Sequence, residues 1–463
     1  MQLVAYGAQD IYLTGNPMIT YFKVVYRRHT NFAVESIAQT FNGNIGFNSR
    51  CSALISRNGD LVSGLTLEVS LPTIADTNAL NFTTWIDKIG HYLIKEVSIE
   101  IGGQEIDKHY DDWLEIWAQL SVPAEQRYGY NAMIGHDIIQ QDYSETIRRG
   151  LQFQSAGNEF VNPGQYLDEN NRRVLYIPLQ FWFCRNYGLA LPLIALQYHE
   201  VKINLKTRAA NELFNAGDAT GAGITTLPTG LNQIDFKLWA DYIYLDTDER
   251  RRFAQVSHEY LIEQLQFNGI TPFENVNTSI SLNFNHPVKE LVWICQQSRN
   301  IQQSTTVVNP RVNQWSNFTT NLSIDTRTQG TSDANPVTTP DIETGGNPAK
   351  NICETAVLKL NGHERFSKQQ GPYFNMVQPY EHHTNIPESP GINVYSFALK
   401  PEDHQPSGTC NFSRIDNAEL ILTLRGEQNG VFNADDQGII KVFATNYNVL
   451  RIMSGMGGLA YSN

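Results

Sequence analysis

The chain contains an internal repeat, which restricts its fold more than any other feature of its 463 residues. Three blocks of the first half recur in the same order in the second half, as expected for two related units. They are Phe41-Asn42-Gly43 with Phe267-Asn268-Gly269, Ile99 to Glu105 with Leu358 to Glu364, and Phe236 to Ala240 with Ile440 to Ala444. The first match continues without a gap until Leu65 aligns with Leu291. We therefore predict two similar domains.

The spacing between matched residues changes along the chain and so locates insertions. It rises from 226 to 259 and then falls to 204. The rise places extra residues of the second half within Gln296 to Lys350, and the fall places those of the first half within Ser121 to Arg172 and Ala209 to Gly230. We expect three long surface loops, which commonly carry binding determinants. The alternative is that they are merely tolerated insertions, since exposed loops cost little.

Alternating apolar and polar residues predict that the domains are built from β-strands. Leu65 to Leu71, Val97 to Ile101 and Val201 to Leu205 are apolar at every second position, as in half-buried strands. Helical spacing is rarer, and we expect short helices at Trp113 to Leu120, after a possible Asp111 cap, and at Asp248 to Ala254, after an Asp246 cap. Each copy is long enough for about eight strands, arranged as a jelly roll or an up-and-down barrel. Periodicity alone does not choose between the two.

The charge of the chain argues against direct nucleic-acid binding. The chain has 34 Lys and Arg residues and 47 Asp and Glu residues, which gives a net charge of −13. Proteins that bind the phosphates of nucleic acids do so with clustered cations. The two basic clusters, Arg27-Arg28-His29 and Arg250-Arg251-Arg252, are isolated trios. Because guanidinium groups bind carboxylates bidentately, we predict that these arginines form ion pairs between domains or between subunits. Ordinary solvated arginines are the alternative.

Catalytic motifs are missing from the sequence. It has no P-loop, no GxGxxG and no GxSxG pattern. The acidic pairs Asp111-Asp112 and Asp435-Asp436 are interpreted as solvated turn residues. Glu381-His382-His383 lacks a third metal ligand at helical spacing. We predict no enzyme activity, no metal and no cofactor.

Long blocks of the sequence resemble the major capsid proteins of nucleocytoplasmic large DNA viruses. With the strand segments between them, they cover most of the chain. The blocks are Tyr6 to Asp10, Leu13 to Pro17, Phe22 to Phe32, Asp246 to Phe253, His258 to Ile262, Asn446 to Gly455 and Gly458 to Asn463.

The resemblance implies an all-β fold, the double jelly roll: two eight-stranded antiparallel β-sandwiches in tandem, with short helices and long loop insertions. It implies four segments along the chain. They are an N-terminal arm at the inner base of the capsomer (1–35), a first jelly roll (36–245), a linker with a short helix (246–260) and a second jelly roll (261–463).

The resemblance also implies a structural role in the virion capsid, in a protein made and assembled in the host cytoplasm. Three copies would form a homotrimer with a pseudo-hexagonal outline. The implied partners are neighbouring capsomers, penton proteins and minor capsid proteins, with an internal membrane nearby and no direct contact with nucleic acid.

In this family, inserted loops rise as towers on the outer face. We therefore consider four residues of the third interval as a surface contact, with host glycans as one partner, or as a glycan attachment site: Trp315, Asn317, Phe318 and Asn321. Both asparagines begin N-x-S/T sequons, which can also occur by chance in a chain rich in Asn and Thr. A carbohydrate- or receptor-binding module built on the same jelly rolls is the alternative function, and a glycoside hydrolase is a third.

Overall fold

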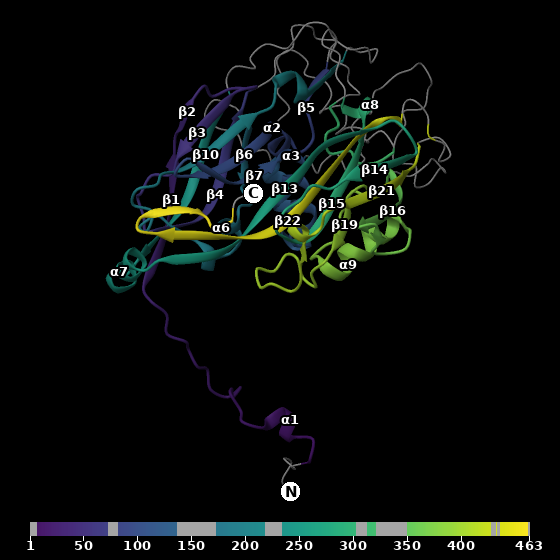
Figure 1. Ribbon diagram of the computed structural model, residues 1–463. Coiled ribbons are helices and arrows are strands. Elements are labelled where there is room, and N and C mark those ends of the chain that lie inside the picture. Colours follow the sequence, from purple (N-terminus) through teal and green to yellow (C-terminus); the bar gives the residue numbers. More distant parts are fainter. Residues whose placement is uncertain are drawn as a thin grey trace.

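The computed structural model describes residues 7–72, 82–136, 173–217, 234–301, 313–320, 350–426, 432 and 436–461. Strands are the main regular structure in this part of the chain, and the helices are short (Figure 1). None of the described helices is both long enough and apolar enough to span a membrane.

The first half holds strands and short helices up to residue 255. They are α1 (Ile11–Thr14), β1 (Phe32–Gln39), β2 (Phe41–Gly43), β3 (Arg50–Leu54), β4 (Leu61–Leu71), β5 (Phe82–Trp85), α2 (Ile89–Leu93), β6 (Ile94–Ile101), β7 (Gln104–Tyr110), α3 (Asp111–Ser121), α4 (Ala124–Ile134), β8 (Arg173–Pro178), α6 (Trp182–Arg185), η2 (Tyr187–Leu189), β9 (Leu191–Pro192), β10 (Val201–Thr207), η3 (Ala210–Glu212), β11 (Phe214–Gly217), β12 (Asp235–Leu245) and α7 (Thr247–Gln255).

The second half repeats this succession with fewer helices. Its elements are β13 (His258–Phe273), β14 (Asn277–Ser281), β15 (Pro287–Gln297), α8 (Ser298–Ile301), β16 (Cys353–Leu360), β17 (His363–Glu364), β18 (Gln369–Gln370), η5 (Tyr373–Val377), α9 (Gln378–His382), β19 (Asn393–Ser396), β20 (Cys410–Asn411), η6 (Phe412–Arg414), β21 (Ala418–Leu424), β22 (Gly438–Met453) and β23 (Met456–Leu459).

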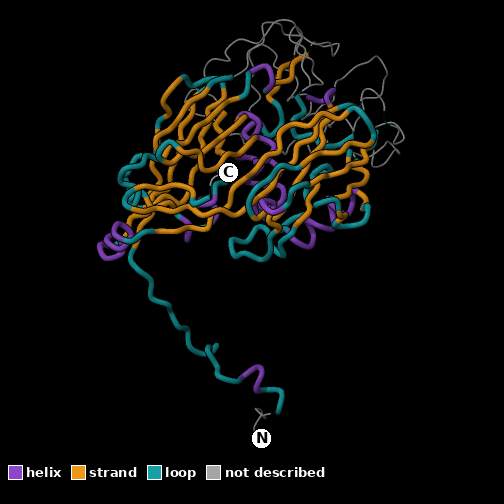
Figure 2. Tube along the Cα trace, in the orientation of Figure 1, coloured by secondary structure: helices purple, strands orange, loops and turns teal. Residues whose placement is uncertain are grey.

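The two halves have the same strand order. One sheet runs β1-β12-β4-β8 in the first half and β13-β22-β15-β19 in the second. The other runs β3-β10-β6-β7 and β14-β21-β16-β17, with β2 added beside β3. All of these pairings are antiparallel, and the strands fill the body of the molecule (Figure 2). The fold is a double jelly roll, as the resemblance implied.

The strand register confirms the internal repeat. Leu65 pairs with Ala240 in the first half, and their repeat counterparts Leu291 and Ala444 pair with each other in the second. Two different offsets thus converge on one structural pair, because both halves align the same strands in the same register. The repeat therefore reflects two halves with the same fold, and the short sequence matches are not a coincidence.

The repeated Phe-Asn-Gly tripeptide marks an irregular point in the strands. Gly43 and Gly269 both have positive φ, 109° and 87°. In the first half the tripeptide forms β2, which follows β1 in the other sheet and ends at Gly43, and in the second half the register of β13 shifts between Phe267 and Ile270. Glycine adopts positive φ without steric cost, which explains why it recurs at this point.

The predicted insertions fall largely outside the described residues. Within the described parts, Ser121 to Arg172 contains α4, and Ala209 to Gly230 contains η3 and β11. The prediction that Gln296 to Lys350 is a surface loop throughout is wrong at its start. Gln296 lies in β15 and is fully buried, because it continues the ladder with β22 opposite Ile439.

Each half has its own hydrophobic core between its two sheets. The long strand β22 extends beyond the second core, so that Leu450 and Ile452 join the core of the first half. In Figure 1 this strand crosses the body toward α7. The two sandwiches are therefore held together by continuous secondary structure as well as by side chains.

Candidate assembly interfaces

Helix α3 lies between the two halves and is buried on every side. The sequence predicts this helix, and it begins at Asp111 rather than after it. Trp113, Ile116, Trp117 and Leu120 pack against Val292, Ile294, Phe443 and Phe318 in a third apolar cluster. Because α3 belongs to the first half and β15 and β22 to the second, this cluster joins the two jelly rolls.

The acidic pair at the start of α3 is also buried, so the prediction of solvated turn residues is wrong. Asp111 forms an ion pair with Arg208, and Asp112 forms one with Lys441 of β22. Burial raises the pKa of Asp112 to about 6, although Lys441 acts to lower it. The helix position accounts for this burial, since both residues lie in the first turn of a helix that is enclosed by two sheets. Asp112 with Lys441 is therefore an ion pair between the halves.

A second set of buried charges links β13, β15 and α6. Lys289 Nζ lies 2.8 Å from Glu263 Oε1, and Arg185 Nη1 lies 3.1 Å from Glu263 Oε2. Arg185 belongs to the first half and also stacks on Trp117, 3.9 Å from the ring centroid. One carboxylate thus binds a cation from each half.

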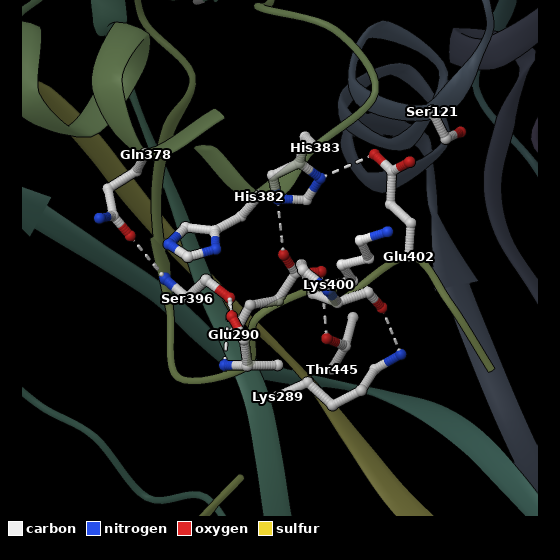
Figure 3. Close-up of polar contacts among 12 residues, drawn as sticks. Ser121, Lys289, Glu290, Gln378, His382, His383, Ser396, Lys400, Glu402 and Thr445 are labelled. Atoms are coloured by element: carbon white, nitrogen blue, oxygen red, sulfur yellow. Dashed lines mark hydrogen bonds and ion pairs between the residues drawn. The ribbon is translucent and has the colours of Figure 1, made fainter. Parts of the chain in front are cut away.

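His383 is enclosed by two carboxylates beside this set (Figure 3). Its Nε2 lies 2.9 Å from Glu290 Oε2, and its Nδ1 lies 2.8 Å from Glu402 Oε1. Burial acts to lower the pKa of His383, but the two carboxylates outweigh it and raise the pKa to about 9. The imidazole is therefore a buried cation that joins α9 to β15 and to the loop containing Glu402.

Two of the residues considered as a surface contact or glycan site, Asn317 and Phe318, do not lie on the surface. Phe318 is fully buried in the cluster around α3, and Asn317 is buried as well. Trp315 is half-buried; it donates a hydrogen bond to Glu212 O at 2.9 Å, and Arg208 stacks on its ring at 3.8 Å. Residues 313–320 therefore fasten the second half's insertion to η3 of the first half. Asn321 lies outside the described residues.

The two basic clusters differ in their surroundings. Arg250 Nε lies 2.9 Å from Asp60 Oδ1, which ties α7 to the residue before β4, although the Arg250 side chain is 62% exposed. Asp246 accepts a hydrogen bond from Thr247 N and caps α7 as predicted, and the helix begins at Thr247, one residue before the predicted start. Arg27 and Arg28 are exposed on the N-terminal segment. Ion pairing by Arg251, Arg252, Arg27 and Arg28 stays a prediction.

Residues 7–31 form an arm that extends away from the body (Figure 1). All residues from Ile11 to Asn31 are exposed. Its large apolar side chains are exposed by 64 to 99%: Ile11, Tyr12, Leu13, Met18, Ile19, Tyr21, Phe22, Val24, Val25 and Tyr26. A soluble chain rarely exposes so much contiguous apolar surface unless a partner covers it.

Comparison with known proteins identifies the family to which the chain belongs. The family described as "Major capsid protein N-terminus" matches residues 20–246, and that described as "Large eukaryotic DNA virus major capsid protein" matches residues 249–458. The chain belongs to the major capsid proteins of large eukaryotic DNA viruses. Its role is structural, in the capsid of the virion.

Relatives in this family match the chain over nearly their whole length. The major capsid protein of Phaeocystis pouchetii virus is 45% identical, with 100% of this chain and 99% of the relative covered. That of Pyramimonas orientalis virus is 47% identical with the same coverage. A chain of the PBCV-1 virus capsid quasi-atomic model is 38% identical, covers 96% of this chain and 100% of its own, and has a TM-score of 0.73.

Sequence reasoning missed the capsid protein's buried charges. Glu263, Lys289 and Glu290 occur in strands, and their half-buried partner Arg185 in α6, without any motif that distinguishes them from surface residues. His383 was considered only as part of a metal site, and the described residues contain no group of three or more potential ligands arranged to hold a metal ion. One available signal was Lys441, since the apolar block from Ile440 to Ala444 places a charge within a predicted buried strand.

Proposed function

We propose that three copies of the chain form a closed capsomer with a pseudo-hexagonal outline. The repeated strand order carries this proposal, because two similar units per chain and three chains per ring give six similar positions. A three-fold ring requires a head-to-tail contact, in which the first half of one copy meets the second half of the next. Such an obligate interface buries roughly 2,000 Å² or more in total.

The segments of the chain would serve this assembly in different ways. Residues 36–245 and 261–463 would form the two jelly rolls, and residues 246–260 the linker between them. Residues 1–35 would lie at the inner base, near minor capsid proteins and an internal membrane. The exposed apolar side chains of residues 11–26 support a role in contact for this arm. Weaker contacts with neighbouring capsomers and penton proteins would then build the shell, assembled in the host cytoplasm.

The oligomeric state of the purified chain tests the proposal. Light scattering should give about three times the chain mass of 52.3 kDa, and electron micrographs should show hexagonal plates or shells. A stable monomer across the accessible concentration range would contradict it. Carbohydrate or receptor binding is not favoured as the function, because Phe318, one of the residues considered for such a contact, is buried in the core between the halves.

A further inference from the structure

A compact apolar patch lies on the second half, around α9. Met376 and Val377 are adjacent at the end of η5, and Tyr380 follows about one turn later in α9; they are 50%, 41% and 77% exposed. Leu399 is 72% exposed, and its backbone lies next to the end of α9, since His382 Nδ1 is 3.0 Å from Leu399 O. We call these four residues the α9 patch. The buried His383 network holds α9 and the following loop in place beneath it.

We propose that the α9 patch of one copy binds the N-terminal arm of the neighbouring copy in the capsomer. This inference rests on the proposed trimer and specifies one of its contacts. Both surfaces are apolar and uncovered in the isolated chain, and covering each with the other would remove two exposed patches together.

The position of the two surfaces favours this pairing. The arm leaves the first half beside α7, and α9 lies at the same lower edge of the body in Figure 1. In a head-to-tail ring, the first half of one copy stands next to the second half of the following copy. The arm therefore starts beside the half of the neighbour that carries the α9 patch. Twenty-five residues, 7–31, can span up to about 80 Å when extended, which is ample reach.

Charge supports the same partner. The arm carries Lys23, Arg27 and Arg28 against Asp10 alone, whereas α9 and the four residues after Leu399 carry the exposed acids Glu381 and Asp403 with one exposed cation, Lys400. A basic arm with apolar side chains thus meets an apolar patch with a mildly acidic rim. Such complementarity fixes the orientation of a contact more than its strength.

Disulfide trapping between differently tagged copies tests the proposal. Chains carrying Phe22→Cys are co-assembled with chains carrying Tyr380→Cys, oxidised and separated on a non-reducing gel. We expect a covalent heterodimer, several-fold more abundant than with Ile270→Cys in place of Tyr380→Cys. Ile270 is a matched control, because it is 59% exposed and lies on the same half, in β13. Unsubstituted chains control for the five native cysteines.

Each outcome of this experiment has one meaning. Trimers without a crosslink above the Ile270 control would overturn the arm contact and leave the proposed function intact. A crosslinked monomer from a chain with both substitutions would also overturn it, since the arm would then bind its own body. Absence of trimers would contradict the proposed function itself.

Proteolysis of intact trimers gives a second measurement. Trypsin should cleave after Lys23, Arg27 and Arg28 several-fold faster in a Tyr380→Asp trimer than in an Ile270→Asp trimer. Equal cleavage rates would contradict the proposal.

Discussion

Two adjacent histidines show how strongly a single position depends on its environment. The side chain of His382 is partly exposed and its Nε2 lies 3.8 Å from Glu381, whereas His383 is buried between Glu290 and Glu402. Removing one partner of a buried ion pair leaves an uncompensated charge, which costs several kcal/mol. The sequence gives both residues the same chemistry, and only the fold distinguishes them.

We expect His383→Gln to lower the free energy of unfolding by about 3 kcal/mol, because Glu290 and Glu402 would lose their cation. His382→Gln is the matched control and should lower it by no more than about 1 kcal/mol, because His382 makes one hydrogen bond, to Leu399 O. Urea unfolding followed by tryptophan fluorescence, at one protein concentration, measures both. Similar values for the two variants would show that the His383 ion pairs do not stabilise the fold.

The pH dependence of stability should reveal the same cation. The folded pKa of His383, about 9, lies above its ordinary value of 6.5, so the folded state holds the proton more tightly. The stabilisation is complete below pH 6.5 and is lost as the pH rises through 9. The difference in unfolding free energy between the unsubstituted chain and His383→Gln should therefore shrink across this window. A difference independent of pH would contradict the assignment.

The buried ion pair between Asp112 and Lys441 can be tested for its net contribution to the free energy of unfolding. Asp112→Ala alone should cost about 3 kcal/mol, because Lys441 would stay buried without its partner. Asp112→Leu combined with Lys441→Met should recover most of that loss, since an apolar pair avoids the desolvation of two charges. Unfolding curves of the single and double variants measure this. A double variant no more stable than the single one would show that the site needs its charges.

At the scale of elements, close backbone contact fixes residues 313–320 on the body. A Cβ on Gly391 would lie 1.9 Å from Phe318 O. The backbone just before β19 or the backbone of residues 313–320 would therefore have to move. Gly129 of α4 has open space around it. The two glycines therefore provide a matched pair for testing the anchor.

We expect Gly391→Ala to destabilise the chain by about 2 kcal/mol or more and to speed proteolysis near residues 313–320. Gly129→Ala should instead be neutral or stabilising by up to about 1 kcal/mol, because alanine favours a helix. Thermal unfolding and peptide mapping after limited digestion measure the two effects. Unchanged digestion in Gly391→Ala would contradict the anchoring role of this contact.

Helix α3 shows why the sequence can predict a helix correctly and still predict wrongly which of its residues are exposed. Its spacing predicts an amphipathic helix, yet ten of its eleven residues are buried. The face opposite Trp113 and Trp117 carries Asp111, Asp112 and Glu115, which pair with Arg208, Lys441 and Lys88. The acidic residues of α3 therefore form ion pairs with other elements, and they do not make up a solvent-exposed face.

At the scale of the whole molecule, the arm and the body should be separable. Because residues 11–31 are exposed, deleting residues 1–31 should leave the thermal unfolding of the body nearly unchanged. The same deletion should weaken the association of copies, since the arm offers the largest exposed apolar segment of the described chain. Calorimetry and sedimentation measure the two effects. A large loss of thermal stability in the deleted chain would contradict this separation.

The sequence by itself determined four properties: the two similar units, the all-β fold class, the short helices and the membership of a capsid protein family. These follow from local periodicity and from matched blocks such as Leu65 with Leu291, because strand pairing preserves register in both halves. The tertiary structure decided the environment of individual side chains. Phe318 proved buried, Asp112 paired with a strand 329 positions away, and His383 became a cation between two carboxylates. Burial and ion pairing depend on which distant segments the fold brings together, and local pattern does not record that.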